Sequence, residues 1–317
     1  HLTAASPDPA AGGRGWRVWI DRGGTFTDLV AHDPAGQVHV AKVLSVQPGQ
    51  RQDPAIRALA CLLQRSPTDP LPPELVAEVR LGTTVATNAL LERQLAPVLL
   101  LVNRGLADLL WIGDQRRPAI FSLKIERPQP LAVRVVELDA RLAADGRELS
   151  PLILDRALQQ MVDEARTAGV GSAAVALLHA DRHPQHEQVL GRWLEQQGFR
   201  TVVLSHQVSG RLRLVPRLQT TVAEAALQPV LQAYLQGVQA QLGVGPRLRV
   251  ITSSGALQAP ESLQAKDTIL SGPAGGLLGA VAAARAAGFA DRPILGFDMG
   301  GTSTDVFHHD PDRTDGA

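Results

Sequence analysis

The hydrophobic residues of the chain recur with two periods, and these periods predict strands that alternate with helices. Short runs of apolar or alternating residues predict strands. Apolar residues three or four positions apart, such as Ile56, Leu59 and Leu63, predict helices. The expected strands are 17–20, 25–32, 38–43, 79–81, 98–102, 133–138, 173–178, 201–204, 247–252, 294–297 and 302–308, and the expected helices are 54–64, 84–93, 108–113, 155–167, 184–197, 220–242 and 272–288. This alternation is typical of an α/β fold.

Two segments depart from this rhythm. Residues 114–150 contain several prolines, one alternating strand and the hairpin signal Asp145-Gly146, so we expect an insertion that covers one end of the sheet. The helix 220–242 contains Pro229, which we expect to kink or split it. The helix 272–288 is rich in Gly and Ala. We therefore expect it to be thin, with an apolar face formed by Leu277, Leu278 and Val281.

One eight-residue pattern occurs twice, at Asp21–Asp28 and at Asp298–Asp305. Both copies read D-x-G-G-T-x-T-D, and each follows an apolar run that predicts a buried strand. A Gly-Gly pair bends the backbone sharply and lets it approach a ligand closely. The leading carboxylates suit a hydrated Mg²⁺, which keeps several waters and takes few protein ligands. Two such hairpins are suited to clamping the phosphates of a nucleotide.

The alternatives to this interpretation are weaker. A single G-G-T turn is an ordinary hairpin connection, but turn chemistry alone does not account for the same acid and the same threonines twice. None of Lys42, Lys124 and Lys266 completes a G-x-x-x-x-G-K phosphate loop. The chain also lacks the G-x-G-x-x-G fingerprint of dinucleotide-binding folds.

With its other motifs, the chain resembles the hydantoinase A/5-oxoprolinase family of the actin-like ATPase superfamily. The residues that carry the resemblance are Asp21–Asp28, Leu81–Arg93, His186–Gln188, Leu204–His206, Ser271–Gly276 and Gly296–Val306. Arg22 and the segment Val215–Arg217 look most like 5-oxoprolinase within the family. The resemblance implies an actin-like, ribonuclease H-like domain with a mixed sheet flanked by helices. It also implies that the helix 272–288 links two domains, the second of which is truncated in this chain.

The activity that the resemblance implies is ATP-dependent hydrolysis of a cyclic amide, with 5-oxoproline converted to glutamate as ADP and phosphate are released. Asp21 and Asp298 are the expected catalytic residues and carry the Mg²⁺. The groups expected to contact ATP are Arg22, Gly23, Gly24, Thr25, Thr27, Gly300, Gly301, Thr302 and Ser303. For Arg22, stabilisation of the transferring phosphate and pairing with Asp28 are equally favoured.

A second group of polar residues, Thr83, Thr84, Thr87 and Asn88, lies where a strand passes into a helix. Helix N-termini bind anions, so we expect the carboxylate of 5-oxoproline here. Capping of the helix is the alternative; it explains one threonine but neither Thr87 nor Asn88.

Other conspicuous side chains favour structural roles. The order of His183, His186 and Glu187 does not match zinc-protease spacing, and Pro184 and Glu187 suit the first turn of a helix. His179 follows an apolar strand, where α/β sheets place ligands, but a structural histidine is favoured. Cys61 is expected to pack on the apolar face of its helix.

Composition limits the possible partners and compartment. The net charge is zero, which gives no reason to expect nucleic acid or a membrane surface as a partner, and no apolar run is long enough to span a membrane. One cysteine fits a reducing compartment, so we expect a cytoplasmic protein. The expected partners are a cyclic amide and either a hydantoinase B-type subunit or a fused C-terminal half. Self-association into a homo-oligomer is left open by the sequence.

The expected domains are a disordered leader at 1–15, an N-terminal domain at 16–205 that includes the insertion, and an incomplete hydantoinase A domain at 206–317. The chain stops at Ala317, soon after the second hairpin, so its own function is expected to be partial. Other hypotheses remain open. They are a hydantoinase, a subunit of an ATP-dependent ketone carboxylase, and an inert nucleotide half-clamp or partner-docking fragment.

Overall fold

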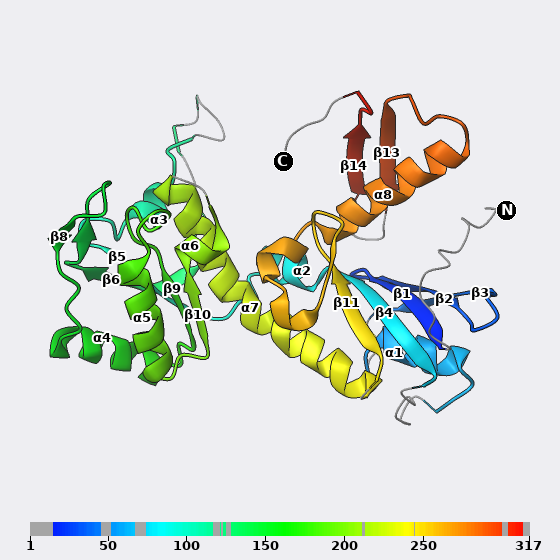
Figure 1. Cartoon of the computed structure of the whole chain (residues 1–317), viewed down its shortest axis with the longest axis horizontal. Coiled ribbons are helices and arrows are strands. Elements are labelled where there is room, and N and C mark those ends of the chain that lie inside the picture. Colours follow the sequence, from blue (N-terminus) through cyan, green and yellow to red (C-terminus); the bar gives the residue numbers. More distant parts are fainter. Residues whose placement is uncertain are drawn as a thin grey trace. The chain divides into compact units, whose positions relative to one another are not determined.

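The computed structural model describes residues 15–45, 52–66, 74–116, 121, 123–124, 128–210, 213–243, 245–299 and 304–312. The chain forms two compact units (Figure 1). Unit 1 contains residues 1–88, 232–263 and 267–317, and unit 2 contains residues 89–231 and 264–266. Helix α7 (Leu214–Leu242) contributes residues to both units. The expected domain boundary near residue 205 stays a prediction.

Unit 1 is built on a six-stranded mixed sheet with the strand order β12-β11-β4-β1-β2-β3. The central pairs β1–β4 and β4–β11 are parallel, and the outer pairs are antiparallel. The bounds of its strands are β1 (Trp16–Arg22), β2 (Phe26–His32), β3 (Val38–Leu44), β4 (Val76–Thr83), β11 (Arg247–Ile251) and β12 (Leu257–Gln258). The mixed sheet flanked by helices confirms the expected fold class.

One face of this sheet forms the core of unit 1. Side chains alternate across a strand, so Val18 and Ile20 of β1 are buried while Trp19 and Asp21 lie on the other face. Helix α1 (Pro54–Leu62) contacts β2 and β3, and it begins where Asp53 caps it by accepting a hydrogen bond from the Ala55 amide. The short elements of this unit are the first part of α2 (Val85–Leu91), whose residues after Asn88 belong to unit 2, and the 3-10 turn η1 (Pro260–Ser262). Cys61 is exposed on α1, so its expected packing role is wrong.

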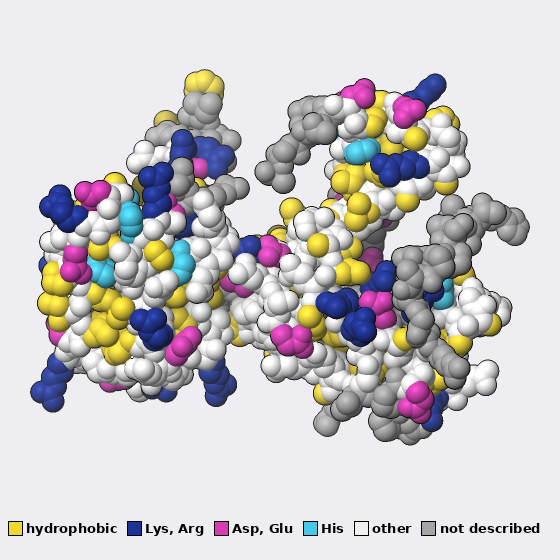
Figure 2. All heavy atoms as spheres, in the orientation of Figure 1, with side chains coloured by type: hydrophobic (Ala, Val, Ile, Leu, Met, Phe, Trp, Pro, Cys, Tyr) yellow, Lys and Arg dark blue, Asp and Glu magenta, His cyan; other side chains and the backbone are white. Residues whose placement is uncertain are grey.

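The last part of unit 1 comprises α8 (Ser271–Ala286) and the hairpin of β13 (Ile294–Met299) and β14 (Thr304–His309). The helix is present as expected, and Ser271 is its only buried residue. Of the expected apolar face, Leu277 and Val281 are partly buried and Leu278 is about half exposed. Hydrophobic side chains gather over this region (Figure 2). The exposed ones on the hairpin are Leu295, Phe297, Met299 and Val306. The hairpin is not isolated, because α8 contacts both of its strands.

Unit 2 is a parallel sheet with the strand order β10-β9-β5-β6 and helices on both faces (green in Figure 1). Its strands are β5 (Val98–Asn103), β6 (Ala132–Leu138), β9 (Ser172–Val175) and β10 (Thr201–Leu204). Its helices include α3 (Leu109–Ile112), α4 (Arg156–Thr167), α5 (Gln185–Gln196) and α6 (Ser205–Val208); a 3-10 turn, η2 (Ala265–Thr268), lies at the unit boundary. Helices α4 and α5 share one core cluster with the sheet, and α7 packs into the other.

The segment 114–150 differs from the expected insertion. Its strand β6 pairs in parallel with β5 and forms the edge of the sheet, so it extends the sheet instead of covering its end. The predicted hairpin is confirmed as β7 (Arg141–Leu142) and β8 (Glu148–Ser150), with Gly146 in a left-handed conformation at the turn. Pro229 does not split α7, which continues through it.

A buried charged network fixes the interior of unit 2. Glu187, which is fully buried on α5, accepts hydrogen bonds from the Leu177 amide (2.9 Å), the Ser205 hydroxyl (2.6 Å) and the His206 ring (2.7 Å). Arg217, about 1 % exposed, donates to Ser205, to the Leu177 carbonyl and to the Asp181 carboxylate at 2.7–3.0 Å. The motifs at 186–188, 204–206 and 215–217 therefore meet in one place, and the predicted helix start at 184–187 is confirmed.

We predict that Arg217→Ala destabilises the protein by about 3–5 kcal/mol, because it leaves the Asp181 carboxylate without its cation and removes the donor to the buried Ser205 hydroxyl and Leu177 carbonyl. Urea unfolding followed by circular dichroism measures the change. Arg213→Ala is the matched control, since Arg213 is exposed one turn before Arg217 and is expected to change stability by less than about 0.5 kcal/mol. Equal stability of the two variants would contradict the assignment.

Candidate active site

The first hairpin places two carboxylates side by side. Asp21, near the end of β1, is the register partner of Asp28 on β2, so both side chains lie on the face of the sheet opposite the core. The turn between them is closed by the Gly23 amide, which donates to the Phe26 carbonyl at 3.0 Å. A Cβ on Gly23 would lie 2.9 Å from that carbonyl oxygen, so this tight turn requires glycine.

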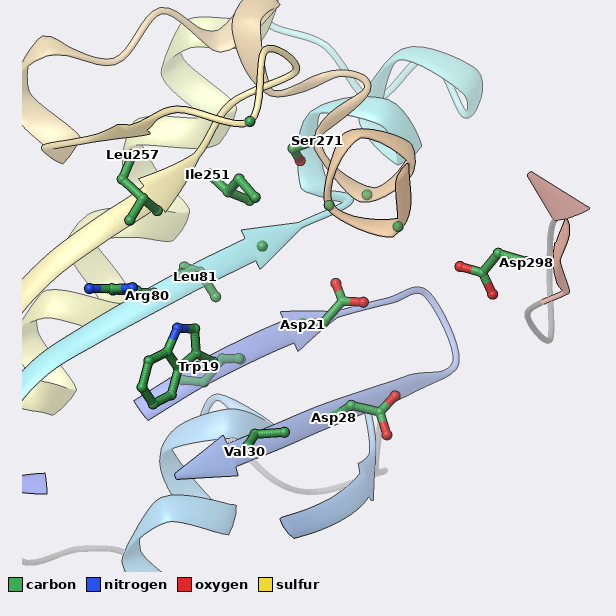
Figure 3. A pocket seen from close by; sticks show the side chains of 16 residues that line it. Trp19, Asp21, Asp28, Val30, Arg80, Leu81, Ile251, Leu257, Ser271 and Asp298 are labelled. Carbon is green, nitrogen blue, oxygen red and sulfur yellow. The ribbon is translucent and has the colours of Figure 1, made fainter. Parts of the chain in front are cut away.

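A cavity of about 420 Å³ opens on this face of unit 1. Trp19, Leu81, Ile251 and Leu257 give it an apolar wall, and the carboxylates lie at its other end (Figure 3). Residues of α8 close another side; these are Ser271, Gly272, Gly275 and Gly276. Gly82 of β4 lies beside Asp21, and a Cβ there would come within 3.3 Å of the Asp21 carboxylate. The glycines therefore leave space next to the acid.

The second hairpin contributes a third carboxylate. Asp298 of β13 lines the same cavity and points toward the side where Asp21 lies (Figure 3). Desolvation raises the pKa of the Asp21 carboxyl, and the negative charges of Asp28 and Asp298 raise it further, while Lys42 lowers it. Lys42 pairs with Asp28 at 2.8 Å. Asp21 is thus a carboxylate in a negative environment, which a bound cation would relieve.

This arrangement fits Mg²⁺ better than a metal that needs a full set of protein ligands. Within the described part of the chain, no group of three His, Cys, Asp or Glu side chains is placed to hold a metal. Mg²⁺ usually keeps several waters and takes one or two carboxylates together with phosphate oxygens. Asp21 and Asp298 are the residues suited to that role. The neighbouring glycines leave room for its water shell.

Arg22 lies away from this cavity. It follows Asp21 on β1, so its side chain lies on the opposite face of the sheet, toward α7 and the start of α1. Its guanidinium lies 3.6 Å from the Asp53 carboxylate and 4.6 Å from the centre of the Tyr234 ring. The expected pairing with Asp28 is therefore wrong. The geometry gives Arg22 a structural contact, and its expected contact with ATP stays a prediction.

The turn of the first hairpin is tied to Ser45, a residue that the sequence did not single out. The Ser45 hydroxyl donates to the Gly23 carbonyl at 2.7 Å and bonds the Thr27 hydroxyl at 2.9 Å, while the Ser45 amide donates to the Thr25 carbonyl. Thr27 is fully buried, so its hydroxyl supports the turn. Gly24 and Thr25 lie at the turn itself. The expected phosphate contacts Gly300, Gly301, Thr302 and Ser303 lie outside the described residues.

The four residues expected to bind substrate also make contacts within unit 1. Thr84 donates to the Arg22 carbonyl through its amide and its hydroxyl, both at 3.2 Å, and its hydroxyl accepts a bond from Asn88. Thr83 caps α2 by accepting from the Val85 amide, and Thr87 donates to the Ile269 carbonyl. The structure gives each of these side chains a structural partner, including the two that capping does not explain. Their contact with substrate stays a prediction.

Known proteins share this architecture. The family profile for the hydantoinase/oxoprolinase N-terminal region matches residues 17–198, and that for hydantoinase/oxoprolinase matches residues 217–314. The chain belongs to the hydantoinase/oxoprolinase family. It is 36 % identical to 5-oxoprolinase 1 of Arabidopsis thaliana over 332 residues, an alignment that covers 93 % of this chain and 25 % of that protein.

Two solved structures agree with the fold. The ATP-dependent caprolactamase from Pseudomonas jessenii superposes with a TM-score of 0.75 and 30 % identity, covering 92 % of this chain and 43 % of that one. A nucleotide-free acetone carboxylase has a TM-score of 0.77 at 22 % identity, covering 93 % and 44 %, and this likeness concerns the fold alone. The chain therefore spans between about a quarter and less than half of these relatives. No helix among the described residues is long and apolar enough to cross a membrane.

We predict that Asp21→Asn stabilises the isolated chain at neutral pH, because it removes a carboxylate whose pKa is raised in the folded state. Between its ordinary value near 3.8 and its raised value, the folded chain holds more protons than the unfolded chain. The stability of the wild type therefore falls as the pH rises through this window. The gain in the variant is at most about 1 kcal/mol, because solvent screens the partly exposed group.

Thermal unfolding of both proteins between pH 3 and pH 8 measures this difference. The two melting curves are expected to converge toward pH 3, where the wild-type carboxyl is protonated. A difference that grows as the pH falls would contradict the assigned environment of Asp21.

Proposed function

We propose that this chain is the nucleotide-binding part of an ATP-dependent hydrolase of cyclic amides, with 5-oxoproline as substrate and glutamate as product. The observation that carries the proposal is that Asp21, Asp28 and Asp298 all line one cavity, together with several glycines. The names of the relatives support it, since they are 5-oxoprolinases and an ATP-dependent caprolactamase. A caprolactam, like 5-oxoproline, is a cyclic amide.

A lactam is a poor electrophile, and ATP supplies the phosphoryl group that converts its oxygen into a leaving group. Transfer of a phosphoryl group depends on positioning and on stabilising negative charge more than on covalent help from the protein. In this proposal Asp21 and Asp298 would hold a Mg²⁺ ion, which would neutralise charge on the phosphates, and their carboxylates would orient the attacking water. Gly24, together with Gly300, Gly301, Thr302 and Ser303, is proposed to offer its backbone amide to the phosphates, whereas the Gly23 amide closes the hairpin turn. Gly82 and α8 keep the space beside Asp21 open.

The proposal includes a partner polypeptide. The relatives are longer than this chain, so a hydantoinase B-type subunit or a fused C-terminal half is expected to complete the enzyme. The exposed apolar side chains of β13 and β14 are consistent with coverage by additional polypeptide. The expected cytoplasmic location belongs to this proposal as well.

A second candidate is an enzyme with the same nucleotide site and a different substrate, such as a lactam without a carboxylate, a hydantoin or a ketone. The observation that favours it is the similarity to caprolactamase, at 30 % identity in the solved structure. A third hypothesis is a fragment that binds phosphate or a partner protein but has no activity of its own. The same assay tests it.

The test is ADP release by the complete polypeptide together with its partner half, in Mg-ATP and with 5-oxoproline, a hydantoin, caprolactam or a ketone in parallel. Stimulation by 5-oxoproline with glutamate formed in step supports the proposal. Stimulation by another compound alone supports the second candidate. If no compound stimulates ADP release, the proposed activity is wrong.

We predict that Asp21→Asn in the complete enzyme lowers turnover by at least about a hundredfold, because the carboxylate proposed to hold Mg²⁺ beside the transferring phosphate is lost. The steady-state rate of ADP release measures the effect, and the melting temperature shows whether the fold persists. Asp139→Asn is the control, because Asp139 forms an exposed ion pair with Arg104 in unit 2. Turnover that survives in the Asp21 variant would remove this residue from the mechanism.

We also predict that residues 1–317 alone hydrolyse ATP weakly or not at all, because the proposed adenosine site requires polypeptide beyond them. Phosphate release by the purified chain measures this. Turnover at the rate of the complete enzyme would show that the chain is sufficient.

A further inference from the structure

The cavity of unit 1 contains side chains that the proposed phosphate chemistry does not use. Its carboxylates serve the cation and the phosphates in that proposal, whereas its apolar side chains and Arg80 have no role there. Among the described residues that line the cavity, Arg80 is the only one with a positive charge. The volume of about 420 Å³ lies in the range of small-molecule sites, about 300–1,000 Å³, so the cavity can hold an organic ligand as well as phosphate oxygens.

The pairing of β1 with β4 fixes where Arg80 lies relative to the acids. Arg80 is the register partner of Trp19, and Gly82 is the register partner of Asp21. All four residues lie on the sheet face opposite the core, because side chains alternate along each strand. Alternate residues on a strand are separated by about 7 Å. This spacing between Arg80 and the acid suits a ligand with one small ring.

Glycines leave the space between Arg80 and the acid open. A Cβ on Gly82 would lie 3.3 Å from Oδ1 of Asp21 and 3.5 Å from Cγ2 of Ile251. The carboxylate and the apolar wall are therefore separated by little more than the volume of an absent side chain. Gly275 of α8 brings its backbone close to the same wall, since a Cβ there would lie 3.7 Å from Cδ1 of Ile251. A ligand at this position contacts apolar carbon and also reaches the acid.

The guanidinium of Arg80 is held in place and keeps donors for a ligand. Its Nε and Nη2 donate to Oε2 of Glu78 at 3.2 Å and 3.0 Å, and its Cζ lies 5.3 Å from the centre of the Trp19 ring (Figure 3). The side chain is 36 % exposed, and its Nη1 makes no hydrogen bond with another described residue. A guanidinium has five N–H donors. Two partners thus orient the group, and the N–H bonds of Nη1 are left for a carboxylate.

The charges around the cavity give a lactam with a carboxylate one favoured direction. In 5-oxoproline the carboxylate and the lactam carbonyl are attached to the two ring carbons that flank the nitrogen. The acids and the phosphates of ATP repel the carboxylate of such a ligand, and Arg80 attracts it. The lactam oxygen is then directed toward Asp21, where the phosphoryl group is transferred in the proposed reaction. The ring carbons pack on Trp19 and Ile251, which shield them from water.

We propose that Arg80 binds the carboxylate of the substrate, and that the cavity of unit 1 holds the ring of the cyclic amide between this arginine and Asp21. This inference rests on the proposed function for the reaction at the lactam oxygen. It assigns the carboxylate to β4 instead of to the start of α2, where Thr83, Thr84, Thr87 and Asn88 already have structural partners. Arg80 is thereby the residue that distinguishes a lactam with a carboxylate from one without.

The first test compares 5-oxoproline with 2-pyrrolidinone, the same ring without the carboxylate, as substrates of the complete enzyme. Arg80→Gln is expected to lower kcat/KM for 5-oxoproline by about tenfold to a hundredfold, the effect of lost hydrogen bonds to a charged group. The value for 2-pyrrolidinone and the KM for ATP are expected to stay unchanged. Arg80→Lys keeps the charge without the planar fork and is expected to recover part of the loss. The melting temperature of each variant shows whether the fold persists.

The matched control is Arg249→Gln, which removes the same charge from the same face of the sheet. Arg249 is the register partner of Arg80 on β11, but it is not among the residues that line the cavity. It is expected to leave the ratio of the two kcat/KM values unchanged. An equal loss in this control would overturn the inference. An unchanged kcat/KM for 5-oxoproline in Arg80→Gln, or a rise in the KM for ATP alone, would also overturn it.

The second test measures binding without turnover and separates this inference from the proposed function. Calorimetric titration of the complete enzyme, with Mg²⁺ and a non-hydrolysable ATP analogue, is expected to show tighter binding of 5-oxoproline than of 2-pyrrolidinone. Arg80→Gln is expected to remove that difference. If no compound stimulates ADP release but this difference is found, the proposed hydrolysis is wrong and the site stands. Equal binding of the two lactams to the wild type, or no binding of 5-oxoproline, overturns the inference even if cyclic amides are hydrolysed.

Discussion

The strict alternation of side chains along β1 is the constraint on which the site in unit 1 depends. Ile20 is buried in the core, and its neighbours Asp21 and Trp19 are therefore on the opposite face, toward the cavity. The core fixes the register of the strand, because a slip of one residue would bury Asp21 and expose Ile20. The same alternation directs Arg22 away from the cavity. Hydrophobic packing thus decides which member of the motif is available for chemistry.

The sequence predicted the strands, the long helices and the pairing of two hairpins, because each of these leaves a local periodic signal. Asp21, Asp28 and Asp298 follow from the repeated motif, and the structure brings them to one cavity. Which charged side chains form ion pairs with one another was less predictable. The sequence left Arg22 with Asp28 as one option, yet Asp28 pairs with Lys42 on the next strand and Arg22 with Asp53. Such contacts depend on which face a residue occupies and on segments far along the chain.

The same limit applies to the other misassignments. The helical spacing of apolar residues over 54–64 suggested that Cys61 lies on the buried face of the helix. This spacing does not show how many side chains on either side of the face are also buried. The strand at 133–138 looked isolated among prolines, because a parallel edge strand has no partner nearby in sequence. Ser45 left no signal at all, since a lone serine after a strand is common. The sequence placed Glu187, Ser205 and Arg217 in three separate motifs. Their role as one hydrogen-bonded network becomes visible only in the structure, where Ser205 bonds both other side chains.

The exposed thiol of Cys61 has a practical consequence. It is the only cysteine among these 317 residues, so one maleimide dye would label unit 1 at a single known position. A second cysteine placed on an exposed position of α4 would then give a pair of fluorophores, one on each unit. The separation between the units, and any change in it on adding nucleotide, becomes measurable by energy transfer without removing a native thiol.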